Sequence, residues 1–360
     1  MGVITRGIAN NTLGTGEIDA TDGVNGVIPA SNVNNTSFGN VTSLPALAGT
    51  ITTVAGDPPA PSEGQVWYNS VAGALKYYGY SRAWASGGNL NTARGYGGGA
   101  GTQDAALMIG GTAGSPTTAT EEYDGSTWTA GGTMGTTRAF LGGAGTQTSA
   151  IGFGGEEPGV PASTATEEYN GTAWTAGGSL PVGRYAIGGV GLQTATVAFN
   201  GAAGSPPSAR NNTDEYDGST WTAGNTRNIS TAYLGGAGIL TAAVAFGGTT
   251  TIATTEEYDG TSWSSANDMN TGRQSIRGMG LQTAAMAVGG TEPAYSNKAE
   301  DYDGTSWTAT TNLSTARQDP GTSTNAPSSL GAVFGGYNGS YTNSTEEFSV
   351  SQANLTISES

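Results

Sequence analysis

Pairs of acidic residues recur along the 360-residue chain, each directly before an aromatic residue, and a pair of carboxyl groups can supply the acid and the base of a hydrolytic reaction. The six pairs begin at Glu121, Glu167, Asp214, Glu256, Glu300 and Glu346. Catalysis of that kind needs two carboxyl groups in unlike environments about 5 to 9 Å apart. Because the six pairs are nearly identical in sequence, we expect them to be structural, and we expect that the protein is not an enzyme.

The composition excludes several other chemistries. The chain contains no His and no Cys, so it cannot form a disulfide, a thiolate nucleophile, an imidazole base or an ordinary zinc or copper site. No Asp-x-Asp-x-Asp loop is present for calcium, and we expect no cofactor and no metal. The net charge of −16 disfavours a nucleic-acid partner, and no apolar run is long enough to predict a membrane span.

A repeat positions the acidic pairs. Five of the six pairs continue through a tight turn into a Trp, as in EEYDGSTW at 121–128. The repeated tryptophans, 42 to 47 residues apart, are Trp84, Trp128, Trp174, Trp221, Trp263 and Trp307. The aromatic residues that follow the acidic pairs are Tyr123, Tyr169, Tyr216, Tyr258, Tyr302 and Phe348. An Arg recurs at one phase of the repeat, as Arg94, Arg138, Arg184, Arg273 and Arg317, and the copy near Thr231 lacks it.

Each repeat reads as four short strands. A small, glycine-rich segment such as 139–145 is followed by a Thr-Gln turn and by an apolar strand such as 149–155, which ends in two glycines. A variable loop leads into the acidic strand, and the Asp-Gly or Asn-Gly dipeptide after the Tyr predicts a hairpin whose two central residues have positive φ. The Trp opens the fourth strand. Four strands in about 45 residues, repeated six times, are typical of a β-propeller.

The ordered combination of a diglycine, a Tyr-Asp turn, a Trp and an Arg resembles the kelch-repeat family over roughly residues 75–350. The resemblance implies an all-β, six-bladed kelch-like β-propeller with four-stranded blades; seven blades is the alternative. The strand at Trp84 has no diglycine strand before it, and the last repeat has no Trp after it. We therefore expect the Trp84 strand to complete the last blade. The family includes a copper oxidase with His ligands, and that activity is not carried over to a chain without His.

The repeated residues predict how the blades hold together. Trp and Tyr bury the largest areas of any side chains, so we expect the repeated aromatic residues to pack between blades. Adjacent residues of a strand point to opposite faces. We therefore expect one carboxylate of each pair to meet the repeated Arg, or a backbone amide, between blades, and the other to face solvent.

The chain is expected to have three parts. Residues 1–65 lack the repeat and read as an extended arm that ends in a Pro-rich linker at 58–64. Residues 66–350 comprise a hairpin, with strands at Val66–Asn69 and Ala74–Tyr78, followed by the propeller. Residues 351–360 read as a C-terminal tail.

The arm contains GVIPASNV at 26–33, LPALAGTITTV at 44–54 and EGQVWYN at 63–69, and it resembles the N-terminal regions of tail-fibre and virion appendage proteins of marine, cyanophage-type tailed bacteriophages. The resemblance implies a virion structural protein, on the tail or the capsid, whose arm docks on other virion proteins and whose propeller contacts a host-surface glycan. It also implies a homo-oligomer, with a trimer as the favoured state. Recognition is expected in the variable loops, which are 112–118, 156–165, 202–213, 249–254 and 291–298.

Two alternative functions stay open. One is a six-bladed glycan-active enzyme, either a sialidase-like hydrolase or a lyase. The other is a bacterial surface adhesin, which the absence of a recognisable signal peptide at the N-terminus disfavours.

Overall fold

The computed structural model describes residues 51–204 and 208–357. These residues form β-structure apart from one 3₁₀ turn at Thr249–Thr251. They divide into two compact units. The first, which we call the propeller unit, comprises residues 83–349, and the second, the terminal unit, contains the described residues on either side, 51–82 and 350–357. Of the arm expected at 1–65, residues 1–50 lie outside the described part of the chain.

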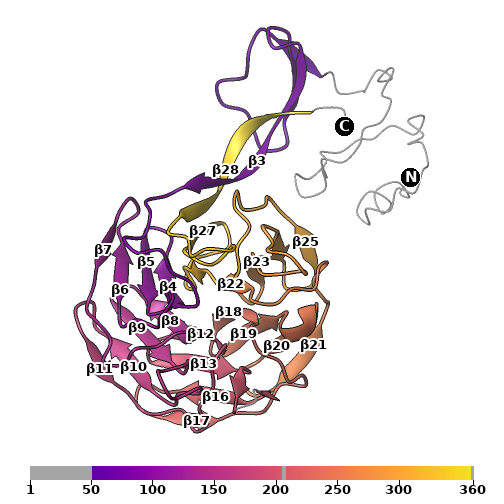
Figure 1. The fold of residues 1–360 in the computed structure, drawn as a ribbon. Coiled ribbons are helices and arrows are strands. Elements are labelled where there is room, and N and C mark those ends of the chain that lie inside the picture. Colours follow the sequence, from indigo (N-terminus) through magenta and orange to yellow (C-terminus); the bar gives the residue numbers. More distant parts are fainter. Residues whose placement is uncertain (1–50, 205–207, 358–360) are drawn as a thin grey trace. The chain divides into compact units, whose positions relative to one another are not determined.

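The described residues of the propeller unit form six four-stranded sheets arranged as blades around an axis (Figure 1). The first blade contains β4 (Gly98–Thr102), β5 (Ala105–Ile109), β6 (Thr120–Tyr123) and β7 (Trp128–Ala130). The second contains β8 (Gly142–Thr146), β9 (Ser149–Phe153), β10 (Thr166–Tyr169) and β11 (Trp174–Ala176). The third contains β12 (Gly188–Leu192), β13 (Ala195–Phe199), β16 (Thr213–Tyr216) and β17 (Trp221–Ala223).

The fourth and fifth blades repeat this antiparallel order. The fourth contains β18 (Gly235–Ile239), β19 (Ala242–Phe246), β20 (Thr255–Tyr258) and β21 (Trp263–Ala266). The fifth contains β22 (Arg277–Leu281), β23 (Ala284–Val288), β24 (Ala299–Tyr302) and β25 (Trp307–Ala309). One small hairpin, β14 (Ala202–Ala203) with β15 (Ser208–Ala209), lies in a loop of the third blade.

The sixth blade closes the ring with strands from both ends of the propeller unit. Its strands are β26 (Gly321–Thr322), β27 (Leu330–Phe334), residues 345–349 of β28 (Thr345–Thr356) and residues 83–86 of β3 (Ala74–Ser86). The predicted six-bladed propeller, with the Trp84 strand completing the last blade, is thereby confirmed. Closure of this kind removes the unpaired strand edges that an open array would expose.

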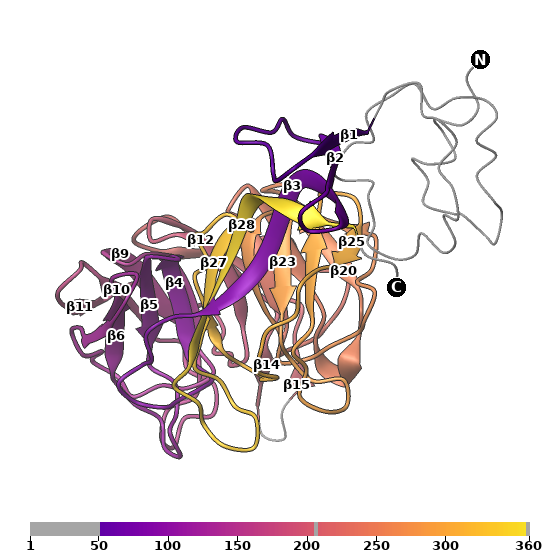
Figure 2. The ribbon, with the colours of Figure 1, turned by 90° about the horizontal axis from the view of Figure 1, so that it is seen from above.

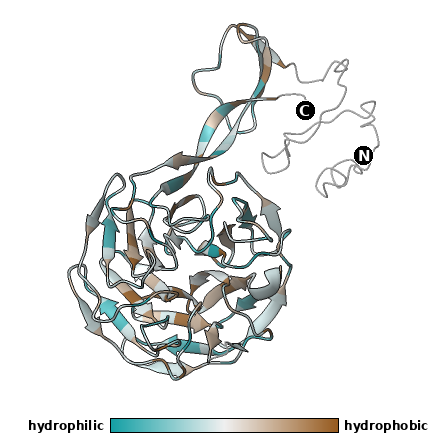
Figure 3. Cartoon of the chain, in the orientation of Figure 1, coloured by the Kyte–Doolittle hydropathy of each residue, from teal (hydrophilic) through white to brown (hydrophobic). Residues whose placement is uncertain are grey.

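The hydropathy of each strand follows its place in the blade. The second strands are apolar and buried, as in β9 and β13, whereas the third strands carry the acidic pairs; Figure 3 shows the two as brown and teal segments. The first strands lie at the axis and are rich in glycine because they approach one another closely there. A Cβ atom on Gly99 would lie 2.2 Å from the backbone oxygen of Thr322 in the sixth blade.

The hairpin between the third and fourth strands is present, but its turn differs from the predicted one. In the first blade Tyr123 pairs with Trp128 across a four-residue loop, and in that loop Gly125 has φ 86° whereas Asp124 does not have positive φ. The Asp124 carboxylate instead accepts hydrogen bonds from the backbone N–H groups of Ser126 (2.9 Å) and Thr127 (2.7 Å). The prediction of positive φ at both residues was wrong because the Asp side chain supplies the bonds that organise the turn.

The terminal unit is a small sheet. β1 (Thr52–Val54) pairs in parallel with β2 (Val66–Asn69), and β2 pairs with the first part of β3 in the predicted hairpin. Residues 350–356 of β28 belong to this unit, so the segment expected to be a tail from 351 is a strand as far as Thr356. The hairpin had been expected to belong with the propeller, in residues 66–350. It groups instead with the terminal unit.

Asp57 organises the terminal unit. Its carboxylate accepts hydrogen bonds from the indole of the buried Trp67 (3.2 Å) and from the amide of Asn69 (2.8 Å). These bonds give the residues between β1 and β2 a fixed place in the sheet. Across residues 51–204 and 208–357, no helix has the length and apolar character needed to cross a membrane.

Candidate functional site

A buried Arg lies in the linker that enters each blade and forms an ion pair with the first carboxylate of that blade's acidic pair. Within the described residues the pairs are Arg94–Glu121, Arg138–Glu167 (2.9 Å), Arg184–Asp214, Arg227–Glu256 (2.6 Å), Arg273–Glu300 (2.9 Å) and Arg317–Glu346 (2.5 Å). The six Arg side chains are fully buried. Each pair therefore fastens an inter-blade linker to the blade that it enters.

The fourth blade does not lack its Arg, as the sequence suggested. Arg227 lies four residues before Thr231 and reaches the same place from a different backbone position. It pairs with Glu256 and lies over the ring of Trp263, with 5.3 Å from the guanidinium carbon to the ring centroid. Its Nη1 also donates to the side chain of Asn200 (2.9 Å). The spacing of the other Arg residues did not predict Arg227, because it lies four residues earlier in its repeat. The long Arg side chain makes up for this shift of the backbone.

The second carboxylate of each pair does not simply face solvent, as was expected; in five blades it accepts a hydrogen bond from the Tyr hydroxyl of the next blade. The pairs are Tyr123–Glu347, Tyr169–Glu122, Tyr216–Glu168 (2.6 Å), Tyr258–Glu215 and Tyr302–Glu257 (2.9 Å). Burial, followed by this hydrogen bond, raises the pKa of Tyr123 and of Tyr216 to about 12. The two carboxylates of a pair thus have separate structural tasks.

The repeated Trp residues also join neighbouring blades. Each packs against the ring of the Tyr or Phe of its own blade, with ring centroids 4.9 to 5.0 Å apart. Five indoles donate to the Thr that opens the third strand of the preceding blade, in the pairs Trp128–Thr345, Trp174–Thr120, Trp221–Thr166, Trp263–Thr213 and Trp307–Thr255, at 2.8 to 3.0 Å. Trp84 donates instead to the backbone oxygen of Thr311 (2.8 Å).

The Gln of the Thr-Gln or Leu-Gln turn recurs visibly in the sequence, but its pattern predicted only a turn. Each of these Gln side chains donates to two backbone oxygens of the preceding blade. Gln147, for example, reaches the oxygens of Ala106 (3.1 Å) and Tyr123 (2.6 Å). The others are Gln103, Gln193 and Gln282. The recurring side chains are therefore engaged in holding the ring, and a binding site is to be sought where the copies differ.

One residue in each linker has positive φ without being Gly, and the six residues form a closed ring around the axis. They are Tyr96, Phe140, Ala186, Tyr233, Ser275 and Asp319, with φ between 44° and 60°. The N–H of each donates to the backbone oxygen of its neighbour in the ring, at 2.6 to 3.0 Å. Left-handed backbone at a residue other than Gly costs about 1 kcal/mol or more, and such strain gathers at functional sites. Nothing in the sequence marks these positions because their residue types differ.

The ring and the variable loops lie on the same face of the propeller. Isolated bridges join linkers to loops between second and third strands, as in Gly95–Thr112, Tyr185–Ala202 and Gln318–Tyr337. Figure 2 views the propeller from the side, with the β14–β15 loop beyond the ends of the blade strands. The predicted recognition loops belong to this face; of them, 202–213 includes residues 205–207, which lie outside the described residues.

Seven aromatic residues gather on this face, and we call them the aromatic mouth. They are Tyr96, Phe140, Tyr185 and Tyr233 from the linkers, with Tyr295, Tyr337 and Tyr341 from the loops. The ring centroids of Tyr96 and Phe140 are 4.4 Å apart, and those of Tyr337 and Tyr341 are 5.2 Å apart. Most of these side chains are half-buried, and Tyr295 is 39% exposed. The mouth thus presents ring faces and hydroxyl groups side by side.

Glu156 and Asp319 act on tyrosines of the aromatic mouth. Burial raises the pKa of Glu156, and the pKa of Tyr185 is raised by burial first and then by the charge of Glu156. Asp319 is fully buried and forms an ion pair with Arg277 (2.9 Å); burial raises the pKa of Asp319, and Arg277 opposes that shift. Burial and the charge of Asp319 raise the pKa of Tyr96 to about 12.

Arg277 stands at the axis where the other blades have Gly. The equivalent residues are Gly98, Gly142, Gly188, Gly235 and Gly321. In the second blade a Cβ atom on Gly142 would lie 2.3 Å from the ring of its cross-strand partner Phe153. Arg277 has Val288 as its partner, and the smaller side chain leaves room for the Arg. In the fifth blade, Arg277 in place of Gly thus occurs together with Val288 in place of the Phe of the second blade.

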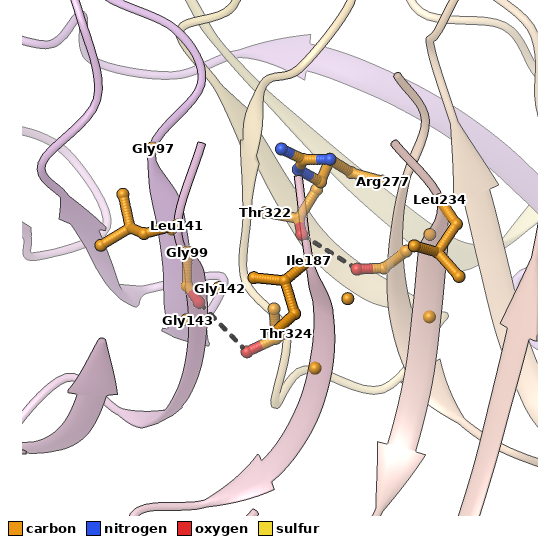
Figure 4. A pocket seen from close by; sticks show the side chains of 16 residues that line it. Gly97, Gly99, Leu141, Gly142, Gly143, Ile187, Leu234, Arg277, Thr322 and Thr324 are labelled. Carbon is orange, nitrogen blue, oxygen red and sulfur yellow. Dashed lines mark hydrogen bonds between the residues drawn. The ribbon is translucent and has the colours of Figure 1, made fainter. Parts of the chain in front are cut away.

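The axial channel below the mouth is narrow. It is lined by residues in and next to the first strands of all six blades, with Arg277, Thr322 and Thr324 among many glycines (Figure 4). The hydroxyl of Thr322 donates to the oxygen of Gly278 (2.9 Å), across the join between the fifth and sixth blades. About 40 Å³ is open to the centres of water molecules, which is room for a few waters and too little for a sugar ring. A larger ligand must therefore lie over the mouth.

Comparison with known proteins identifies the fold. The solved structure of YjhT is similar to this chain, with a TM-score of 0.61 and 14% identity, over 74% of this chain and 99% of that one. The protein is a β-propeller. No family model and no curated protein matches the sequence. The kelch-repeat and bacteriophage resemblances of the sequence therefore stay predictions.

Proposed function

We propose that the protein is a non-enzymatic binding protein that contacts a saccharide through the aromatic mouth. The observation that carries the proposal is the clustering of Tyr96, Tyr295, Tyr337 and Tyr341 with three further aromatic residues on the face that also holds the variable loops. Tyr combines a flat apolar ring with a hydroxyl group, which suits the apolar faces and hydroxyl groups of a sugar. A binding surface made of rigid aromatic side chains also loses little entropy when it is occupied.

The state of Asp319 and of the acidic pairs favours binding over hydrolysis. A glycosidase needs two carboxyl groups on either side of the bond that it cleaves. Asp319 is fully buried and paired with Arg277, so it cannot touch a bound sugar. The acidic pairs of the third strands are engaged with Arg and Tyr side chains.

We further propose that the protein is an appendage of a tailed bacteriophage, on the tail or the capsid, and that the propeller contacts the host surface. Support comes from the sequence phrases at 26–33, 44–54 and 63–69 and from the separate terminal unit, which offers a docking part distinct from the propeller. As a homo-oligomer, with a trimer as the favoured state, it would bind a surface glycan with an avidity roughly 10² to 10⁴ times the single-site affinity.

Binding of the full-length protein to arrayed bacterial surface polysaccharides tests the saccharide proposal. The Tyr337→Ala/Tyr341→Ala variant should lose at least about tenfold in affinity. A Tyr80→Ala variant is the matched control, because Tyr80 is 47% exposed in the terminal unit and should leave binding unchanged. Equal binding by the mouth variant and the unmodified protein, or no binding to any polysaccharide, would contradict the proposal.

A glycan-active enzyme is the second candidate, favoured by the raised pKa of Glu156 next to Tyr185 at the mouth. A raised carboxyl pKa is a feature of the general acid of many hydrolases. Incubation with the polysaccharide that binds, followed by size analysis and a test for unsaturated ends, distinguishes the two. Shortened products that disappear with Glu156→Gln would replace the binding proposal by hydrolysis or elimination.

A further inference from the structure

The backbone holds Glu156 beside the aromatic mouth. Glu156 follows the diglycine of the second blade, at the start of the loop between β9 and β10. Its N–H donates to the backbone oxygen of Ala139 in the linker (2.7 Å), and its own oxygen accepts from the N–H of Ala139 (3.1 Å). Ala139 directly precedes Phe140 of the mouth. The position of Glu156 is therefore fixed next to a residue of the mouth.

The position of Glu156 has an equivalent in every blade, directly after the two residues that end the second strand and bonded to the linker in the same way. The equivalents are Thr112, Ala202, Thr249, Thr291 and Tyr337. Tyr337 is itself a residue of the aromatic mouth, so this position borders the mouth. Glu156 is the one charged residue among the six. The second blade thus adds a carboxyl group where the other blades have uncharged side chains.

Three rings of the mouth form one group in this region. The ring centroid of Phe140 is 6.3 Å from that of Tyr185 and 6.1 Å from that of Tyr233, and the two Tyr centroids are 6.4 Å apart. The planes of each pair meet at 77° to 88°. After burial, the charge of Glu156 raises the pKa of Tyr185, and it also contributes to the raised pKa of Tyr233, after burial and the charges of Tyr185 and Asp319. The carboxylate is therefore within electrostatic reach of both Tyr hydroxyls.

The carboxylate of Glu156 is available to a ligand. Within residues 51–204 and 208–357 it has no hydrogen-bond or ion-pair partner, although the residue is partly buried. The neighbouring Glu157 accepts a hydrogen bond from the hydroxyl of Ser163, and Asp319 is paired with Arg277. A partly buried carboxylate costs free energy unless a donor or a cation meets it. A ligand that supplies a donor with a positive charge recovers this cost.

Positive charge is scarce on the same face. The loops between the second and third strands contain two basic residues, Arg210 and Lys298. Lys298 forms an ion pair with Glu292 (2.9 Å), and Arg210 is exposed. The six Arg residues of the linkers are buried in ion pairs with the acidic strands. The charges of this face therefore favour a cationic group over an anionic one.

We propose that Glu156 binds the protonated amine of an amino sugar, next to the rings of Phe140 and Tyr233. The inference rests on the proposed saccharide binding and adds the class of sugar. An ammonium group forms charge-assisted hydrogen bonds with a carboxylate, and a cation within about 6 Å of an aromatic centroid is attracted to the face of the ring. An N-acetylated amine carries no charge and gains neither interaction.

Two tetrasaccharides of equal length test the proposal, one of glucosamine with free amines and one of N-acetylglucosamine. Titration calorimetry on the full-length protein measures both affinities at about pH 6, where amines of this kind carry a proton. We expect the free-amine form to bind at least about tenfold more tightly. Equal affinities, tighter binding of the acetylated form, or binding of neither would overturn the proposal.

Glu156→Gln assigns the preference to this residue, because it keeps the size of the side chain and removes the charge. The variant should bind the two tetrasaccharides alike. Since the net charge of −16 attracts any cationic sugar, the matched control is Asp104→Asn. Asp104 is exposed in the turn between β4 and β5, at the opposite end of these strands from the mouth, and its variant should keep the preference. If Glu156→Gln keeps the preference, or both variants lose it equally, the amine binds elsewhere and the proposal fails.

The polysaccharide array separates this proposal from the one on which it rests. Binding of uncharged polysaccharides through the mouth, together with equal affinities for the two tetrasaccharides, would leave saccharide binding in place and overturn the role of Glu156 alone. An array without any binding would overturn both.

Discussion

The indole N–H of Trp128 in the first blade donates to the hydroxyl of Thr345 in the sixth, at 2.9 Å, and so joins residues 217 positions apart. The bond has the same geometry as the four equivalent Trp–Thr bonds, which join blades that are consecutive in sequence. The ring thus closes through the contact that it uses between successive blades. Thr345→Val should lower the free energy of unfolding by about 1 to 3 kcal/mol, because the buried indole N–H loses its acceptor.

Thermal unfolding followed by calorimetry measures this loss. The control is Thr129→Val, at an exposed position of the first blade's fourth strand, where a change within about 0.5 kcal/mol is expected. Equal effects of the two substitutions would show that the Trp128–Thr345 bond does not hold the ring.

Removal of a buried Arg should be the most damaging single change in a linker. Arg138→Ala leaves the carboxylate of Glu167 buried without its partner, and we expect a loss of about 3 to 5 kcal/mol in the free energy of unfolding. Arg210→Ala, at an exposed position, is the control and should change little. Denaturant titrations of both variants measure the difference, and an unchanged midpoint for Arg138→Ala would contradict the role assigned to the ion pair.

The Asp of the hairpin turn should be replaceable by Asn and not by Ala. In the second blade Asn170 already accepts the two backbone hydrogen bonds that Asp124 accepts in the first. Asp124→Asn should therefore be nearly neutral near pH 7, whereas Asp124→Ala should lower the melting temperature because the backbone N–H groups of the turn lose their acceptor. The melting temperatures of the two variants test this prediction. An equal fall in melting temperature for both would mean that the side-chain oxygen does not organise the turn.

Acid should destabilise the same turn. Hydrogen bonds from the backbone N–H of Thr127 first, then from the side chain and N–H of Ser126, lower the pKa of Asp124 to about 2, from 3.8 in an unfolded chain. A lowered carboxyl pKa contributes stability that is present above pH 3.8 and is lost as the pH falls towards 2. The Asp124→Asn variant should lose less stability over this range than the unmodified protein. Identical melting curves for the two proteins between pH 4 and pH 2 would argue against it.

Alkali should weaken the fold through the inter-blade Tyr residues. The pKa of Tyr123 and of Tyr216 rises from 10 to about 12 in the folded protein, through burial and then through the hydrogen bond to a carboxylate. A raised pKa means that the folded state holds its proton longer, so its contribution to stability is complete below pH 10 and falls between pH 10 and 12. Melting temperature and tyrosinate absorbance measured together test this. Tyr216→Phe should make the fall shallower; an unchanged slope would contradict the prediction.

The local pattern of the repeat was enough to predict the elements and their number. The apolar second strand, the acidic third strand and the Trp of the fourth recur with little variation, and each is decided by residues within one repeat. The unmatched Trp84 strand at one end and the unmatched Phe348 strand at the other also predicted how the last blade closes, because a ring must pair every strand. The regular position of the Arg in the repeat did not predict Arg227, because its side chain reaches Glu256 of the fourth blade from an earlier position in the linker.

Local sequence is therefore sufficient to predict the blade: its strands, its turn positions and the residues that recur in it. Tertiary structure alone decided what the second carboxylate binds, since the Tyr hydroxyl that reaches Glu122 comes from a residue 47 positions away. It also decided the ring of linker residues with positive φ, because Tyr96, Ser275 and Asp319 share no residue type and meet only when the fold brings the six linkers together. Local propensity acts within a few residues, whereas the contacts that shape the mouth exist only after the chain has closed on itself.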